Sequence, residues 1–301
     1  MKLETTREAV AALFLERQRL DRPRARNLSA ASLVDFARAT GGIQLDSINV
    51  LERAHLLTLW SRFGEFDRRR FETLAYGRRL LFEYWAHAAC LIAADDLPAW
   101  RRVMLDYRVR HRGWPSFLRR NPRLLAEVES AIRDRGPLGN ADFDGPRPRG
   151  ASPGWWSWKP ATHALDYLWM SGRLLVSSRV HFQKRYDLAE RVLGDVLAVE
   201  PPTAEAFRRW HVRRALSAMG AATETDLRMY LTFPRTTALE RRRTLAAMLA
   251  EGEVVEISVR GDSARWLILR EDVRALARVA RRPRPSIGTT FLSPFDSFLW
   301  H

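Results

Sequence analysis

Hydrophobic residues near the amino terminus recur mainly at the three- and four-residue spacing of amphipathic helices. A helix is predicted in NLSAASLVDFARATGG, with a polar amino-terminal cap near Asn27 to Ser29 and a glycine stop at Gly41 and Gly42. A second helix is predicted in INVLERAHLLTLWSRFG and a third, short one in RRFETLAYG. The next run, RRLLFEYWAHAACLI, cannot be assigned to strand or helix by its pattern alone.

Further helices are predicted in the middle of the chain, followed by a linker. The helices are expected in DDLPAWRRVMLDYRVRHR and PRLLAEVESAIRDRG. The stretch GNADFDGPRPRGASPG is dense in Gly, Pro and Asp, and this composition is typical of a loop between domains.

Two later stretches combine helices, a glycine and a basic hairpin. In the first, the amphipathic helix KPATHALDYLWMSG ends at Gly172 and is followed by the paired strands RLLVSSR and HFQKRYDL. In the second, the helix pair in TETDLRMYLTF and TALERRRTLAAMLAEG ends at Gly252, and the strands EVVEISVR and RWLILRED follow. This order is typical of a winged helix. The two helices and the aromatic run near the amino terminus suggest a third such unit.

The predicted fold class is therefore mainly α with small β-hairpins (α+β), in a tandem array of three winged-helix units around 28–95, 155–190 and 203–272. The predicted domains are residues 1–95 (amino-terminal helix and first unit), 96–154 (helical insertion and linker), 155–200 (second unit), 201–280 (third unit) and 281–301 (a carboxyl-terminal segment with the motif SPFD).

Composition indicates a globular, soluble protein. Apolar residues make up 46% and charged residues 28% of the 301 positions, and no run of 18 apolar residues predicts a membrane span. Charges interrupt the amino-terminal helix too often for a signal peptide. The single cysteine, Cys90, excludes an internal disulfide and a Cys-rich zinc site, and this fits a reducing, cytoplasmic compartment. We also expect the protein to be a monomer and to associate with the nucleoid.

The net charge of +15 and the pI of about 11.1 favour a polyanionic partner. Almost all cations are arginines, which can bind phosphates through two nitrogens, and this suits double-stranded DNA. An arginine-biased genome with plainly solvated surfaces is the alternative. The candidate DNA-binding residues are Arg147, Arg149, Trp156, Lys159, Arg173, Arg179, Lys184 and Arg185.

Motifs typical of metal sites and of cofactor binding are absent from the sequence. Histidines show no HxxxH or HExxH spacing on a clear helix, so no metal is expected. The chain has no GxGxxG or Walker motif, and we therefore predict no cofactor.

An amide and a carboxylate stand two residues apart in GGIQLDSIN. In one interpretation Asp46 or Ser47 caps a helix that begins near Ile48, and Gln44 is a loop residue. In the other, the segment is extended, so Gln44 and Asp46 face the same side while their apolar neighbours point into the core. Side by side, the two groups could then orient water and stabilise a developing oxocarbenium ion.

Several stretches carry a resemblance to a known family, in order from about residue 28 to the end. They are GGIQLDSINVLERAHLLTLWSRFG, LFEYWAHAACLI, GWWSWKPATHALDYLWMSGRLLVSSR, FQKRYDLAERVL and FLSPFDSFLW. Together they resemble the AlkZ/YcaQ-like family of bacterial DNA glycosylases. The family signature is Gln, an aliphatic residue, then Gln or Asp, and Gln44-Leu45-Asp46 is similar to the YcaQ-like form.

The resemblance implies tandem winged-helix units, catalytic roles for Gln44 and Asp46, and a monofunctional glycosylase of base excision repair. Its expected substrates are the alkylated purines N7-alkylguanine and N3-alkyladenine, and some members also unhook interstrand crosslinks. The family's carboxyl-terminal β-rich domain is expected to be missing, because the chain stops at His301. A winged-helix DNA-binding or transcription-regulating protein without catalysis is the alternative, and it would need neither Gln44 nor Asp46.

Overall fold

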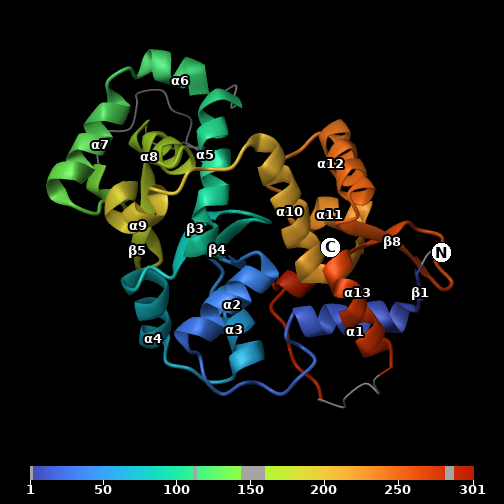
Figure 1. Cartoon of the computed structure of the whole chain (residues 1–301). Coiled ribbons are helices and arrows are strands. Elements are labelled where there is room, and N and C mark those ends of the chain that lie inside the picture. Colours follow the sequence, from blue (N-terminus) through green and yellow to red (C-terminus); the bar gives the residue numbers. More distant parts are fainter. Residues whose placement is uncertain (1–2, 111–113, 144–159, 282–287) are drawn as a thin grey trace. The chain divides into compact units, whose positions relative to one another are not determined.

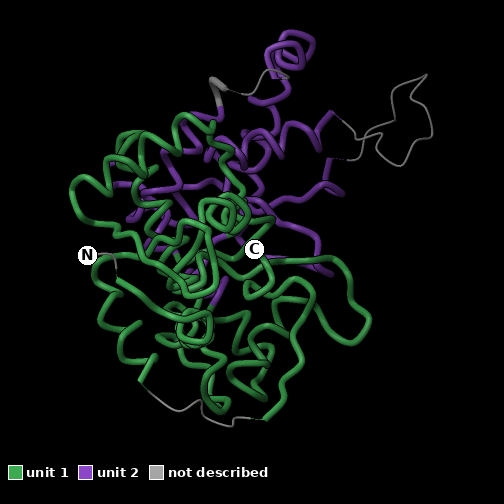
Figure 2. The backbone as a smooth tube through the Cα atoms, turned by 90° about the vertical axis from the view of Figure 1, so that its right-hand side faces the viewer, with its two compact units in different colours: residues 1–74, 83–93, 202–301 green, residues 75–82, 94–201 purple. Residues whose placement is uncertain are grey.

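The computed structural model describes residues 3–110, 114–143, 160–281 and 288–301. It is mainly helical with small sheets and hairpins, as the hydrophobic pattern predicts (Figure 1). The chain divides into two compact units (Figure 2): unit 1 comprises residues 1–74, 83–93 and 202–301, and unit 2 comprises residues 75–82 and 94–201. The division into three winged-helix units, around 28–95, 155–190 and 203–272, remains a prediction.

Unit 1 is formed by segments from both ends of the chain. Its amino-terminal elements are β1 (Leu3–Thr5), α1 (Arg7–Arg17), α2 (Ala30–Thr40), β2 (Ile43–Gln44), α3 (Ala54–Phe63), α4 (Arg68–Glu72) and β4 (Ala89–Ala93). Its later elements are α10 (Ala204–Met219), β7 (Ala221–Thr223), α11 (Glu224–Tyr230), α12 (Ala238–Ala250), β8 (Val254–Val259), β9 (Trp266–Leu269), the 3-10 turn η4 (Arg270–Asp272), α13 (Val273–Ala280) and the 3-10 turn η5 (Ser297–Leu299). The π-helical turn η1 (Thr73–Gly77) and β3 (Leu81–Trp85) have residues in both units.

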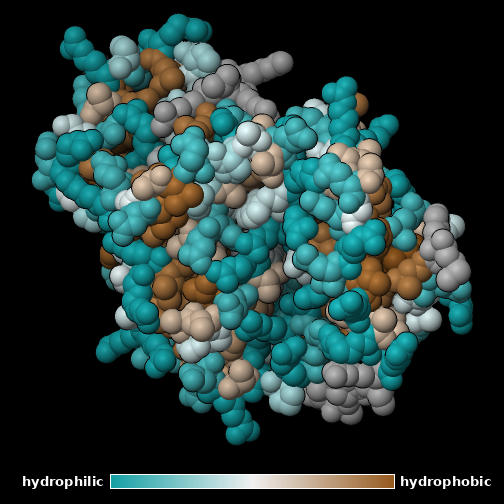
Figure 3. Space-filling view, in the orientation of Figure 1, coloured by the Kyte–Doolittle hydropathy of each residue, from teal (hydrophilic) through white to brown (hydrophobic). Residues whose placement is uncertain are grey.

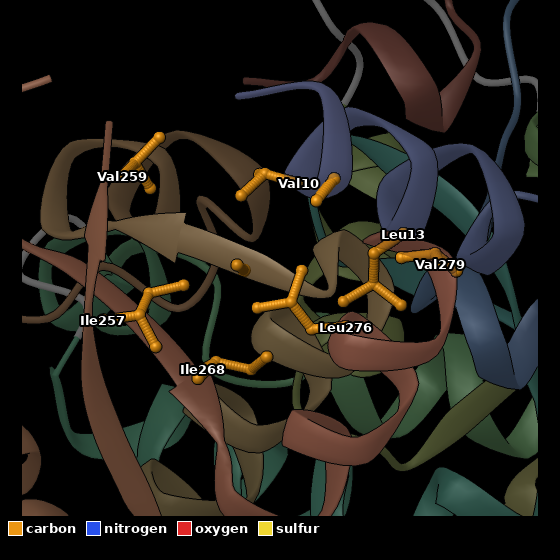
Figure 4. Close-up of a cluster of buried hydrophobic side chains, with 9 residues drawn as sticks. Val10, Leu13, Ile257, Val259, Ile268, Leu276 and Val279 are labelled. Carbon is orange, nitrogen blue, oxygen red and sulfur yellow. The ribbon is translucent and has the colours of Figure 1, made fainter. Parts of the chain in front are cut away.

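A four-stranded sheet in unit 1 joins the two ends of the chain. Its order is β1-β8-β9-β7, and β1 pairs parallel to β8 while β8 and β9 form an antiparallel hairpin. Helices α1 and α13 pack against each other beside it (Figure 1). Their apolar faces meet the sheet in a buried cluster that includes Val10 and Leu13 of α1, Ile257 of β8, Ile268 of β9 and Leu276 of α13 (Figure 4). Burial of these side chains anchors the amino-terminal helix to the carboxyl-terminal hairpin.

A smaller sheet, in the order β2-β4-β3, lies in the amino-terminal part. The aromatic run RRLLFEYWAHAACLI, which its pattern could not assign to strand or helix, thus contains the two neighbouring strands β3 and β4. Helix α2 has the predicted ends, because Ser29 caps its first turn and Gly41 ends it in the left-handed conformation, with φ +74°. The expected helix start near Ile48 is wrong, since α3 begins only at Ala54 and ends at Gly64 as predicted.

Unit 2 is helical around one hairpin. Its elements are the 3-10 turn η2 (Ala94–Asp96), α5 (Leu97–Arg110), α6 (Trp114–Arg120), α7 (Leu124–Arg135), the 3-10 turn η3 (Asn140–Phe143), α8 (Pro160–Met170), β5 (Leu174–Val180), β6 (Gln183–Leu188) and α9 (Ala189–Leu197). Strands β5 and β6 are antiparallel, with a bulge between Val176 and Ser178. The predicted order of helix, glycine and basic hairpin is therefore present.

On the face drawn in Figure 3, hydrophilic residues predominate and hydrophobic ones form interrupted patches. No helix among the described residues is both long and apolar enough to cross a membrane.

Candidate active site

Gln44 and Asp46 lie on the outer side of a short extended segment. Strand β2 pairs antiparallel with β4, with Ile43 opposite Leu91 and Gln44 opposite Cys90, and the amide of Leu45 donates to the carbonyl of Ala89 at 2.8 Å. The exposed fractions are 1% for Ile43 and 6% for Leu45, whereas Gln44 and Asp46 are partly exposed. The segment alternates as a pleated strand does, so the amide and the carboxylate project to the same side.

Two glycines set up this strand. Gly41 and Gly42 have φ values of +74° and +142°, a region that other residues rarely adopt. A Cβ atom on Gly42 would lie 3.0 Å from the Cβ of Cys90, so the close approach of the segment to β4 also requires glycine. The pair therefore ends α2, turns the chain and delivers Gln44 to the edge of the sheet.

The side-chain amide of Gln44 is held by an indole. The Nε1 of Trp300 donates to the Oε1 of Gln44 at 2.9 Å, and it also lies 3.3 Å from the carbonyl oxygen of Phe295. Trp300 is 4% exposed. A residue at the far end of the sequence thus fixes the amide of the candidate site.

The carboxylate of Asp46 caps a turn rather than a helix. Its Oδ1 accepts a hydrogen bond of 2.7 Å from the backbone N–H of Ile48. This is a local Asx turn, since α3 begins only at Ala54. An ionised carboxylate offers about four acceptor positions, so the turn leaves Asp46 able to accept from water.

Aromatic rings surround Trp300. The imidazole of His87 stacks on the indole with ring centroids 4.7 Å apart and an interplanar angle of 4°, and the ring of Tyr230 lies 5.3 Å away. The Nδ1 of His87 lies 2.9 Å and 3.1 Å from the carbonyl oxygens of Tyr230 and Met229. Because carbonyls only accept, Nδ1 carries a proton in this arrangement. Burial lowers the pKa of His87 and so favours the neutral ring.

A buried polar network lies behind these rings. Gln18 donates to the hydroxyl of Tyr230 at 2.9 Å and accepts from Ser297 at 2.6 Å. Tyr230 in turn donates to the carbonyl of Thr40 at 3.1 Å, at the end of α2. Burial raises the pKa of Tyr230 well above its usual value, so the phenol stays protonated and can donate. The network links α1, α2, α11 and the carboxyl-terminal segment.

Sequence reasoning did not assign a role to Trp300 or His87. Trp300 lies in FLSPFDSFLW, one of the stretches that carry the family resemblance, and His87 is one of the histidines whose spacing does not fit a metal site. The amino acid pattern gives no sign that residues so far apart in sequence meet at Gln44. Among the described residues, no group of three or more His, Cys, Asp or Glu side chains is placed to hold a metal ion.

Four of the predicted DNA-binding cations lie in unit 2 and have contacts within it. Arg179 and Lys184 are opposite each other on the hairpin. The guanidinium of Arg179 lies 4.2 Å from the ring centroid of Phe182, and the ammonium of Lys184 lies 3.4 Å from that of Trp169.

The other two cations form ion pairs, Arg173 with Glu129 and Arg185 with Asp142. Their side chains remain 36% and 28% exposed. Contact of the four with phosphate remains a prediction. The remaining predicted DNA-binding residues, Arg147, Arg149, Trp156 and Lys159, lie outside the described residues.

Two comparisons with known proteins give the family and the fold of this chain. The family model described as "DNA glycosylase AlkZ-like" matches residues 37–301. Among solved structures, the Streptomyces sahachiroi DNA glycosylase AlkZ is similar with a TM-score of 0.69 and 19% sequence identity, over 98% of this chain and 77% of that chain. At this identity the likeness of the two structures is one of fold.

Proposed function

Because this chain belongs to the AlkZ-like family of DNA glycosylases, we propose that it hydrolyses the N-glycosidic bond of alkylated purines in duplex DNA. The observation that carries the proposal is the geometry of β2. In β2 and the two residues after it, the apolar side chains of Ile43 and Leu45 are buried, while Gln44 and Asp46 are partly exposed, the alternation expected when both project to the same side. A protein that only binds DNA needs no such pair.

The chemistry follows from the charge of the substrate. N7-alkylguanine and N3-alkyladenine are cationic bases, so they can leave without being protonated. One carboxylate and one positioned water can then suffice, in contrast to glycosidases, which use a pair of carboxyl groups. Asp46 is proposed to stabilise the positive charge that develops on the deoxyribose and to accept a proton from the attacking water. Gln44 is proposed to place that water.

Charge and element order support binding to duplex DNA. The net charge of +15 favours a polyanion, and the cations Arg173, Arg179, Lys184 and Arg185 of unit 2 are the proposed phosphate contacts within the described residues. The elements α11, α12, β8 and β9 follow one another as helices and then a hairpin, and so do α8, β5 and β6. We propose that these are winged-helix units, with a third in the amino-terminal part.

Further features of the reaction are part of the proposal. No lysine lies near Gln44 in the sequence, and this agrees with a monofunctional enzyme that leaves an abasic site. Unhooking of crosslinked bases is also proposed, because it breaks the same kind of bond to a cationic purine.

The test is incubation with a duplex that carries one N7-methylguanine, followed by alkaline cleavage of the abasic product. We expect strand breaks only at the modified base and none in an unmodified duplex. Asp35→Asn is a matched control for the catalytic-site variant Asp46→Asn. Its aspartate is 55% exposed and pairs only loosely with Arg38, at 3.4 Å. Tight binding of both duplexes without any excision would favour the non-catalytic DNA-binding alternative.

A further inference from the structure

We propose that Trp300 is a positioning residue that turns the amide of Gln44 so that its NH2 group, and not its oxygen, faces the attacking water. The proposal rests on the proposed glycosylase function and assigns to Gln44 the role of a hydrogen-bond donor. It also gives the carboxyl-terminal segment a part in the reaction.

The direction of the amide follows from the chemistry of indole. The Nε1–H of tryptophan can donate a hydrogen bond but cannot accept one. The side-chain atom of Gln44 that lies 2.9 Å from it must therefore be the carbonyl oxygen, Oε1. This removes the usual ambiguity between the oxygen and nitrogen of an amide, and the NH2 group is directed away from Trp300.

Trp300 is itself held firmly enough to impose this direction. It is 4% exposed, stacks on His87 and lies against Tyr230. His87 is fixed in turn by the backbone carbonyls of Met229 and Tyr230. A stacked, buried indole has little rotational freedom, so the amide of Gln44 is oriented before substrate binds.

The donor role completes the coordination of a water molecule. Water has two lone pairs and two protons. Gln44 donates to one lone pair, the other attacks C1′ of the deoxyribose, and the carboxylate of Asp46 accepts one proton. The new bond joins the water oxygen to C1′, the bond from C1′ to the purine nitrogen breaks, and its electron pair neutralises the cationic base. The two residues then make different contacts with the same water, which explains why an amide and a carboxylate stand side by side.

A double-mutant cycle of Trp300→Phe and Gln44→Ala tests this coupling. Excision is measured in single turnovers with saturating enzyme on the N7-methylguanine duplex, so that binding does not limit the rate. Phenylalanine keeps an aromatic ring but lacks the N–H, and we expect Trp300→Phe to slow excision about five- to tenfold, the effect of one neutral hydrogen bond. In the Gln44→Ala background the same substitution should change the rate less than about twofold. Equal slowing in both backgrounds, or no slowing by Trp300→Phe alone, would overturn the proposal.

A spectroscopic readout separates this proposal from the proposed function. The indole N–H signal of Trp300 can be assigned by ¹⁵N NMR as the one lost in Trp300→Phe, among the signals of 11 tryptophans. We expect this signal to shift in Gln44→Ala, whether or not the protein excises bases. An unchanged signal refutes the hydrogen bond itself. A shifted signal with no excision by the wild-type protein would refute the proposed function while keeping the contact.

Discussion

Arg62 and Asp296 form a two-pronged ion pair in the interior of unit 1. Their side chains are 1% and 0% exposed, and the Nη2 of Arg62 donates to the Oδ1 of Asp296 at 2.8 Å, while Nη1 bonds the other oxygen. The same guanidinium donates to the carbonyl of Gln18 at 3.0 Å. Asp296 belongs to the motif SPFD, so this motif fastens the segment that carries Trp300 to helix α3.

Asp296→Asn should destabilise the protein by about 3–5 kcal/mol, because it leaves the charge of Arg62 buried without a counterion. Asparagine can still accept from the N–H of Phe298, which Asp296 caps at 3.0 Å, so the turn itself is preserved. Urea unfolding followed by circular dichroism measures the change. The control Asp35→Asn on the surface should shift the free energy of unfolding by less than about 0.5 kcal/mol. Similar small shifts for both variants would mean that the ion pair contributes little.

His211 should make stability depend on pH in the acid range. Burial lowers the pKa of its imidazole from 6.5 to about 4, and the ring stacks on Phe207. Between pH 6.5 and about 4, His211 therefore binds a proton in the unfolded chain but stays neutral in the folded protein. The contribution of the neutral His211 to the free energy of unfolding is fully present above pH 6.5. It decreases by about 3 kcal/mol as the pH falls through the range down to about 4.

His211→Gln tests this dependence, because glutamine can form hydrogen bonds and does not titrate. Free energies of unfolding are measured at several pH values from 7 to 4 for both proteins. The variant should lose less stability on acidification than the wild type. Parallel curves would show that His211 does not hold a lowered pKa.

Replacing Lys184 and Arg185 by alanine should weaken binding to damaged and undamaged duplex alike. If both contact phosphate, the slope of log K against log salt concentration should fall by about two. Arg7→Ala with Arg22→Ala is the matched control, since it removes the same charge at side chains that are 65% and 54% exposed in unit 1 and lie outside the proposed wings. Fluorescence anisotropy over a salt series measures the slopes, and thermal unfolding checks the loss of the Arg185–Asp142 pair. The same slope in both double variants would argue against a specific contact by the hairpin.

Gln44→Ala should slow excision about tenfold and leave DNA binding almost unchanged, and it should lower the free energy of unfolding by about 1 kcal/mol because the buried indole N–H of Trp300 loses its shorter acceptor. The amide is partly exposed and places water without supplying charge, so its loss costs less than that of the carboxylate. Single-turnover excision of N7-methylguanine measures the effect. A rate equal to that of the wild type would remove Gln44 from the mechanism.

Local features of this fold could be predicted because they depend on neighbouring residues. The cap at Ser29, the glycine stops at Gly41 and Gly64 and the basic hairpin of unit 2 are all encoded within a few positions of the sequence. The alternation of buried and partly exposed residues from Ile43 to Asp46 also follows from a period of two. The predicted start of α3 failed because INVL has the apolar character of a helix but lies in the loop that the Asx turn of Asp46 opens.

The surroundings of Gln44 could not be predicted in this way. The contact with Trp300 joins residues 256 positions apart, and the stacking of His87 depends on carbonyls of a third segment. Likewise, nothing in the sequence indicates that Asp296 is neutralised by Arg62. Such pairs depend on how the two ends of the chain fold together in unit 1, and periodicity and spacing carry no information on that.

The most direct test of the central claim is excision by Asp46→Asn, measured on the same protein preparation as its stability and DNA affinity. Asparagine keeps the shape of the side chain and can still accept from the N–H of Ile48, so the Asx turn should survive. The variant loses the negative charge that is proposed to stabilise the oxocarbenium ion, and its single-turnover excision of N7-methylguanine should fall about 100-fold or more. Its melting temperature and its affinity for the duplex should match those of the wild type. A stable Asp46→Asn protein that excises at the wild-type rate would contradict the account.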